Sequence, residues 1–87
     1  MDSNDDRRLI VELQKRTDYG LSLLATKYHA FLMDSAMEAF DVPRYNAGEV
    51  VNKVFLDFWR VIDRFVCEKD GDIKAWLITC LKNRCID

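Results

Sequence analysis

The chain has 87 residues and a net charge of −2, and 49% of its residues are hydrophobic. This length is that of one domain with a single core, and the charge excludes a uniformly basic nucleic-acid binder. The acidic N-terminus is unlike a signal peptide and no apolar run is long enough to span a bilayer, so we expect a cytoplasmic protein without membrane insertion. Only three glycines and one proline interrupt the sequence, which favours few turns and long helices.

The N-terminal half of the sequence predicts two helices. Ser3 or Asn4 can cap the first helix, which should end near Thr17. Thr17 or Asp18 can cap the second helix, which should continue to about Phe40. Apolar residues recur at helical spacing through both segments, at Leu9, Ile10, Leu13, Leu21, Leu24, Ala25, Tyr28, Phe31, Leu32 and Ala39.

A third helix is predicted after a connector at residues 41–45, in which Pro43 disfavours a helical residue before it. Asn46 can cap this helix, and Glu49 can reach back to the cap. The helix should end at Phe65 or Val66. Apolar residues recur along one of its faces, at Ala47, Val50, Val51, Val54, Phe58, Val61, Ile62 and Phe65.

The opposite face of the third helix is polar, but Leu56 lies at its centre and Trp59 at its edge. A single exposed leucine is common on protein surfaces. A leucine that lies beside a tryptophan and is surrounded by ions is also typical of a partner-binding surface. The polar members of the face are Glu49, Asn52, Lys53, Arg60 and Asp63.

A fourth helix is predicted through Ile86, capped by Asp72 after a polar loop that contains Gly71. Residues 73–86 include lysine and arginine but no acid. One side of this helix can approach DNA closely, with lysine on phosphate and asparagine on a base edge. A solvated helix face is the simpler interpretation of these residues alone. The side consists of Ala75, Thr79, Lys82, Asn83 and Ile86, and the other side of Ile73, Trp76, Leu77, Cys80 and Arg84.

The sequence contains neither an alternating strand pattern nor an internal repeat, so we predict an all-α, compact four-helix domain. Phe58 and Trp76 should be largely buried in its core. The last helix meets neither glycine nor proline before the chain ends, which is expected for a segment of a longer protein.

The cysteines Cys67, Cys80 and Cys85, together with the single histidine His29, lack the paired spacing of a zinc site. We expect the cysteines to be small buried hydrophobic residues, and we predict neither a metal nor another cofactor. One histidine and scattered carboxylates supply no recognisable acid–base or nucleophile pair, so we also predict that the protein is not an enzyme.

Two blocks of the sequence resemble the second conserved region of a bacterial sigma factor of the extracytoplasmic-function type, within the sigma-70 family. The first family block reads Asp-Ala-Glu-Asp-(Leu/Val)-Val-Gln-Glu-Val-Phe-Leu-x-x-Trp-Arg and is matched by Ala47, Val51, Val54, Phe55, Leu56, Trp59 and Arg60. The second reads Phe-x-x-Trp-Leu-x-x-Ile-Ala-x-Asn-x-x-Ile-Asp and is matched by Trp76, Leu77, Asn83, Ile86 and Asp87, with Ile73 at the Phe position. Leu9, Ile10, residues 21–24 and Tyr28 follow the family's first two helices, so the resemblance covers nearly the whole chain.

The resemblance implies that residues 1–87 form the sigma region 2 domain of a cytoplasmic transcription initiation factor, cut before a linker and a C-terminal helix-turn-helix domain. Its implied partners are core RNA polymerase, through the β′ clamp helices, the minus-ten promoter element and an anti-sigma factor. The residues implied in polymerase binding are Glu49, Asn52, Lys53, Leu56, Trp59 and Arg60. Those implied in binding the single-stranded minus-ten DNA are Lys69, Lys74, Thr79, Lys82, Asn83 and Arg84, with the loop at residues 67–72.

The sequence departs from the family pattern at the start of the third helix, where Asn46, Gly48 and Lys53 replace the usual acids. Lys53 reverses the charge at one polymerase contact, which implies a matching change in the partner. A sigma-like interaction module that binds a partner without reading promoter DNA is therefore the main alternative. A helix-turn-helix binder of duplex DNA is a weaker one, because no short glycine-containing turn joins two compact helices.

Overall fold

The computed structural model describes residues 2–65 and 71–86, and this part of the chain is all-α without any strand. The predicted four-helix fold is confirmed. The domain measures 33 × 24 × 20 Å. Its elements are α1 (Asp2–Gln14), α2 (Asp18–Ala39), α3 (Arg44–Val61), the short 3₁₀ helix η1 (Ile62–Arg64) and α4 (Asp72–Ile86).

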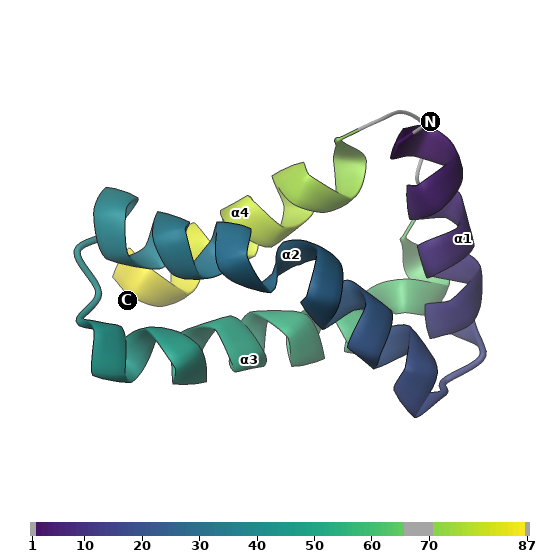
Figure 1. The fold of residues 1–87 in the computed structure, drawn as a ribbon, viewed down its shortest axis with the longest axis horizontal. Coiled ribbons are helices and arrows are strands. Elements are labelled where there is room, and N and C mark those ends of the chain that lie inside the picture. Colours follow the sequence, from purple (N-terminus) through teal and green to yellow (C-terminus); the bar gives the residue numbers. More distant parts are fainter. Residues whose placement is uncertain (1, 66–70, 87) are drawn as a thin grey trace.

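Helix α2 crosses α3 along the length of the domain, α4 packs against both, and α1 lies at one end against α2 and η1 (Figure 1). The apolar stripes of the four helices meet in one core. Ala39, which the spacing assigned to the stripe of α2, is exposed. The buried apolar residues are Leu9, Ile10, Leu13, Leu24, Tyr28, Leu32, Ala36, Ala47, Val51, Val54, Phe55, Phe58, Ile62, Ile73, Leu77 and Leu81.

The ends of α2 follow from local capping chemistry. The backbone N–H of Gly20 donates to the Thr17 hydroxyl at 3.2 Å, which confirms Thr17 as the cap. A Cβ at Gly20 would lie 2.8 Å from the Glu12 carbonyl oxygen, so a glycine is needed for α1 and α2 to approach this closely. At the other end, Asp41 has a φ of 55°, and the Val42 N–H donates to the Ala36 carbonyl at 2.9 Å.

The other predicted helix ends need correction. Helix α1 begins at Asp2, so the predicted start at Ser3 or Asn4 lies within the helix. Helix α3 begins at Arg44, directly after Pro43, whose carbonyl accepts hydrogen bonds from the N–H groups of Asn46 and Ala47 at 2.9 Å. The predicted cap at Asn46 is therefore wrong, because proline has no N–H to leave unpaired and readily starts a helix.

The C-terminal end of α3 and the start of α4 also differ from the prediction. Helix α3 ends at Val61 and the chain continues as η1, so the predicted helix to Phe65 or Val66 is too long. Asp72 was predicted to cap α4 from just outside the helix. It is instead the first helical residue, because the Ala75 N–H donates to the Gly71 carbonyl at 2.8 Å.

Two polar anchors fix α1 to the rest of the domain. The carboxylate of Asp6, which is 2% exposed, accepts a hydrogen bond from the Tyr28 hydroxyl at 2.9 Å and forms an ion pair with Lys27. Because a buried carboxylate without partners is costly, these contacts of α2 compensate its burial. At the other end of α1, Arg16 donates to the Asp63 carboxylate at 2.9 Å and to the Trp59 carbonyl at 2.5 Å.

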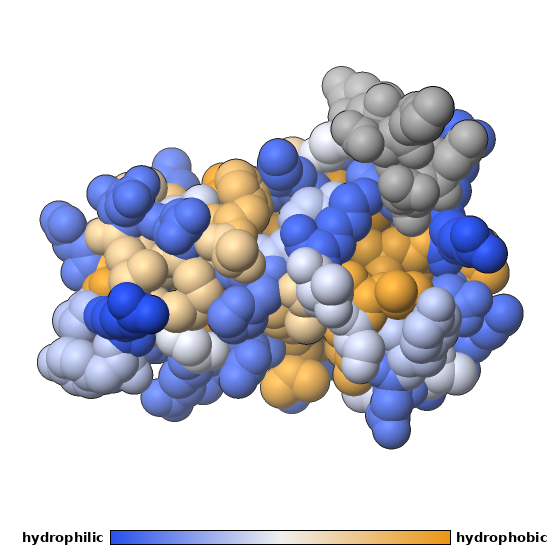
Figure 2. Space-filling model, viewed as in Figure 1, coloured by the Kyte–Doolittle hydropathy of each residue, from blue (hydrophilic) through white to orange (hydrophobic). Residues whose placement is uncertain are grey.

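The surface seen in the view of Figure 1 is mixed, with hydrophilic side chains separating several hydrophobic areas (Figure 2). No helix among residues 2–65 and 71–86 is long and apolar enough to cross a membrane. Within the same residues, no three His, Cys, Asp or Glu side chains gather where they could hold a metal ion.

Candidate functional site

The predicted polar face of α3 lies on the surface of the domain. Leu56 at its centre is 45% exposed, so its apolar side chain is available to a partner. Trp59 differs from its neighbours, because its side chain is only partly exposed and its indole Nε1 is buried without a hydrogen-bond partner. The other predicted residues of this face are all exposed: Glu49, Asn52, Lys53 and Arg60.

The structure also shows how the unusual Lys53 is accommodated. Its Nζ lies 3.2 Å from Glu49 Oε1, one helical turn away, and the two side chains are 53% and 69% exposed. An exposed pair of this kind contributes at most about 1 kcal/mol to stability. Its main consequence is that the charge of Lys53 is balanced within α3. The side chain of Arg60 is 76% exposed, so it is the more accessible cation of the two ion pairs within this helix.

Helix α4 buries a narrow stripe of every fourth residue, Ile73, Leu77 and Leu81. The predicted DNA-binding side chains lie outside this stripe, at Lys74, Thr79, Lys82, Asn83 and Arg84, and all five are exposed. The ammonium group of Lys74 lies 4.5 Å from the ring centre of Phe31, so this cation already contacts an aromatic face of α2. Lys69 lies outside the residues that the structure describes.

Phe58 is confirmed as buried, at 0% exposure, and Trp76 packs against the core with part of its surface exposed. Trp76 lies one position to the side of the buried stripe of α4, and its ring leans against that of Phe58 at 5.1 Å between centres. The ring therefore closes the edge of the core and leaves part of its surface for another contact.

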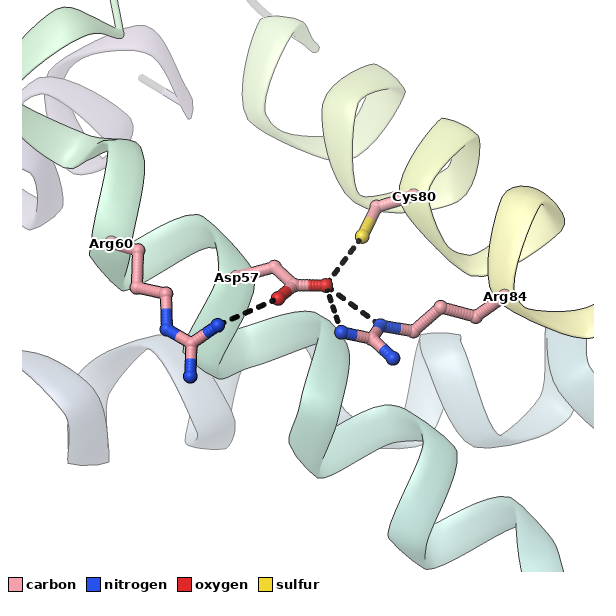
Figure 3. Close-up of polar contacts among 4 residues, drawn as sticks. All are labelled: Asp57, Arg60, Cys80 and Arg84. Atoms are coloured by element: carbon pink, nitrogen blue, oxygen red, sulfur yellow. Dashed lines mark hydrogen bonds and ion pairs between the residues drawn. The ribbon is translucent and has the colours of Figure 1, made fainter.

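A group of four side chains joins α3 to α4 (Figure 3). Oδ2 of Asp57 accepts hydrogen bonds from Arg84 Nε at 2.7 Å and from the thiol of Cys80 at 3.4 Å. Arg84 Nη2 lies 2.6 Å from the same oxygen in an ion pair. Arg60 Nη1 lies 3.9 Å from the other carboxylate oxygen. The sequence did not indicate Asp57 as a site residue. Its contact with Arg60 lies within one helix, but its contact with Arg84 joins residues 27 positions apart, which no local pattern shows.

The same group changes the acidity of two side chains. The hydrogen bond to Asp57 raises the pKa of Arg84 above its ordinary value. Burial, and after it the hydrogen bond and the charge of Asp57, raise the pKa of Cys80 to about 11. Cys80 is thus a protonated hydrogen-bond donor at neutral pH. Cys80 and Cys85 are half-buried free thiols, so the expectation of buried cysteines holds only in part, and Cys67 lies outside the described residues.

A cleft of about 370 Å³ lies between α3 and α4 beside the Asp57 group. Its wall offers an aromatic ring, an amide, a hydroxyl and a guanidinium, which are the groups that stack on and hydrogen-bond to unpaired nucleotides. The Thr79 hydroxyl donates to the Ala75 carbonyl at 2.9 Å and keeps its acceptor capacity. The lining residues are Asp57, Arg60, Val61, Trp76, Thr79, Cys80 and Asn83.

The chain matches the sigma-70 region 2 family over residues 24–87, and it therefore belongs to this family. The matched segment begins in α2 and contains all of α3 and α4, so both candidate surfaces lie inside it. Region 2 is a non-enzymatic domain of transcription initiation factors that serves promoter recognition and polymerase binding. No curated protein and no solved structure matches the chain.

Proposed function

We propose that this chain is the region 2 domain of an alternative sigma factor of the extracytoplasmic-function type, which binds core RNA polymerase and the single-stranded minus-ten element in the cytoplasm. The observation that carries the proposal is the family match over residues 24–87, which includes both α3 and α4. We further propose that residues 1–87 form one unit of a longer factor, with a linker and a helix-turn-helix domain after it.

The polymerase-binding surface in this proposal is the exposed face of α3. Leu56 supplies apolar area at its centre, and such area flanked by ions is what transient protein interfaces use. Because Glu49 balances Lys53 within the helix, Arg60 should determine which charge the partner presents. We expect an acidic side chain of the β′ clamp helices opposite Arg60, and an apolar contact over Leu56.

The DNA-binding surface is the exposed side of α4 with the cleft beside it. Lys82 and Asn83 are adjacent and exposed, and they differ in what they can recognise. Lysine acts as a point charge for phosphate, whereas the asparagine amide offers both a donor and an acceptor to a base. A base taken out of the stack needs a pocket that compensates a few kcal/mol of unstacking, and the cleft that Trp76 and Asn83 line is the candidate.

Capture of core polymerase tests the proposal. Leu56→Asp places a charge in the middle of the face and should reduce capture of core enzyme, or of a β′ clamp fragment, to background. Val11→Asp is the matched control, because Val11 is an apolar residue of α1 with 50% exposure. Undiminished capture by a folded Leu56→Asp chain would contradict the assignment of this face.

The second candidate function is a sigma-like module that binds a partner without reading promoter DNA. The observation in its favour is that Lys53 and Glu49 neutralise each other on α3, so this face lacks the acidic character of the family pattern. Capture of core polymerase by the wild-type chain, with no difference between minus-ten oligonucleotides of different sequence in the assembled complex, would favour this function over promoter recognition.

A further inference from the structure

Helix α4 carries basic side chains and, between residues 73 and 86, no acid of its own. The acid that meets its surface comes from another helix. Asp57 of α3 accepts a hydrogen bond from Arg84 Nε at 2.7 Å, and Arg84 Nη2 lies 2.6 Å from the same oxygen in an ion pair. A charge-assisted hydrogen bond of this length is stronger than one between neutral groups.

This pair is also partly shielded from water. The Asp57 side chain is 24% exposed and that of Arg84 is 35% exposed, whereas the Lys53–Glu49 pair on α3 is more than half exposed at both ends. Shielding strengthens the attraction between opposite charges, and it makes the pair harder for salt to screen. Cys80 adds a further donor to the same carboxylate oxygen, so Asp57 is held in place from two positions of α4.

The pair lies directly beside the residues proposed to read DNA. Asp57 and Asn83 line the same cleft, and Arg84 follows Asn83 in the chain. A nucleic-acid phosphate that approaches this side of α4 must compete with the Asp57 carboxylate for Arg84. Both groups are anions whose oxygens accept charge-assisted hydrogen bonds from a guanidinium, so they compete for the same donors.

We propose that Asp57 determines DNA specificity by withholding Arg84 from phosphate. The inference rests on the proposed function of α4 and names a residue of α3 as part of its regulation. Phosphate contacts raise the affinity for every sequence alike, whereas base contacts discriminate. With Arg84 neutralised by Asp57, binding depends relatively more on Thr79 and Asn83 and less on sequence-independent charge.

The salt dependence of binding tests the proposal without knowledge of the promoter. The probe is a fluorescent single-stranded dT12, bound by the full chain between 20 and 200 mM KCl and followed by fluorescence anisotropy. Asp57→Asn keeps the shape of the side chain and removes its charge. It should bind dT12 more tightly and steepen the slope of log K against log[salt] by about 0.7, the value for one added phosphate contact to a single strand.

Two further variants isolate the role of Arg84. Arg84→Gln should keep the wild-type slope, and Asp57→Asn combined with Arg84→Gln should return to that slope. Asp63→Asn controls for net charge, because it removes a carboxylate whose partner is Arg16 at 2.9 Å, in another ion pair. This control should leave the slope within about 0.2 of the wild-type slope, well below the change for one phosphate contact.

Several results would overturn the proposal. The first is an Asp57→Asn variant whose salt slope is unchanged or that does not bind dT12 at 20 mM KCl. The second is a steeper slope that persists when Arg84 is also replaced. The third is an equally steep slope for Asp63→Asn. A slope for Arg84→Gln that is shallower by about 0.7 would show that Arg84 already contacts phosphate, and this variant leaves Asp57 untouched if Asp57→Asn does not fold. Failure of the chain to capture core polymerase would remove the proposed function but not the result with dT12.

Discussion

Helices α3 and α4 both carry candidate binding residues, but they hold their charges in different ways. On α3, Lys53 pairs with Glu49 of the same helix, and both side chains are more than half exposed. On α4, Arg84 pairs with Asp57 of the other helix, and the two side chains are less exposed, at 35% and 24%. A local exposed pair adds little to stability, whereas a shielded pair between helices also fixes how the two helices face each other.

The difference teaches that the two surfaces are separable at some positions and shared at others. Leu56 points to solvent, and a change there should affect partner binding alone. Asp57, the next residue, contacts α4, so a change there should reach the DNA-binding side. Neighbours in the sequence of α3 thus belong to different proposed surfaces, because successive helical positions lie about 100° apart.

The largest expected effect would break the packing that keeps α3 and α4 together. Phe58 is 0% exposed, and its ring lies 5.0 Å from that of Phe65 and 5.1 Å from that of Trp76, centre to centre. Phe58→Ala should lower the free energy of unfolding by about 3–5 kcal/mol. Trp76→Ala should cost about half as much, because part of the ring is already in contact with water.

Urea unfolding followed by circular dichroism measures both changes without relying on tryptophan fluorescence. The test is which of the two variants loses more free energy of unfolding. If Trp76→Ala were more destabilising than Phe58→Ala, α4 and not α3 would supply the centre of the shared core, and Trp76 would have little surface left for a ligand.

How far the sequence predicts this structure depends on the range of each interaction. The helical period of α3 separated most of the core residues from the exposed face around Leu56, since that pattern needs only the sequence of one helix, but it left out the buried Phe55. The helix start at Arg44 was missed because the prediction placed Pro43 in the connector and took Asn46 as the cap, whereas Pro43 occupies the N-cap position without a side-chain hydrogen bond.

Contacts between distant residues could not be predicted in the same way. The pairs of Asp57 with Arg84, of Arg16 with Asp63 and of Tyr28 with Asp6 join residues at least 22 positions apart. The sequence of one element does not show these partners, because each charged member reads as an ordinary surface residue and Tyr28 reads as a core residue. Only the packing of the helices brings them together, so the charge available on α4 followed from the fold and not from its sequence.

A smaller effect sharpens the comparison within α4, between a residue expected to read bases and one expected to hold phosphate. Asn83→Ala should relax the preference at one base pair of the minus-ten element by about 1–3 kcal/mol. Lys82→Ala should instead weaken binding to all sequences alike and flatten the salt dependence by roughly one unit of slope. Both residues are exposed, so neither change should affect folding.

The measurement uses the variant chains assembled with core polymerase on a set of promoter fragments that differ at single positions of the minus-ten element. An Asn83→Ala complex that ranks all fragments as the wild type does would place base discrimination elsewhere on the domain. In that case the loop before Asp72 becomes the next segment to test.

The smallest expected effect uses Cys80 as a reporter of the contact between α3 and α4. Its pKa is raised from 9.0 to about 11, first by burial and then by Asp57. A rise of two units lowers the thiolate fraction about a hundredfold near neutral pH, and the greater nucleophilicity of a more basic thiolate recovers about half of this on a logarithmic scale. In a background of Cys67→Ser and Cys85→Ser, iodoacetamide should therefore modify the folded chain about tenfold more slowly than the unfolded chain.

Burial also hinders the reagent directly, so the two charged neighbours of Cys80 provide the sharper test. Asp57 raises the pKa of Cys80 and Arg84 lowers it. Asp57→Asn should therefore speed the modification, because it removes the negative charge that disfavours the thiolate, and Arg84→Gln should slow it. Steric protection alone does not predict rate changes of opposite sign, since neither variant places additional atoms over the Cys80 sulfur. Changes in the same direction for both variants would contradict an electrostatic contact of Cys80 with the Asp57–Arg84 pair.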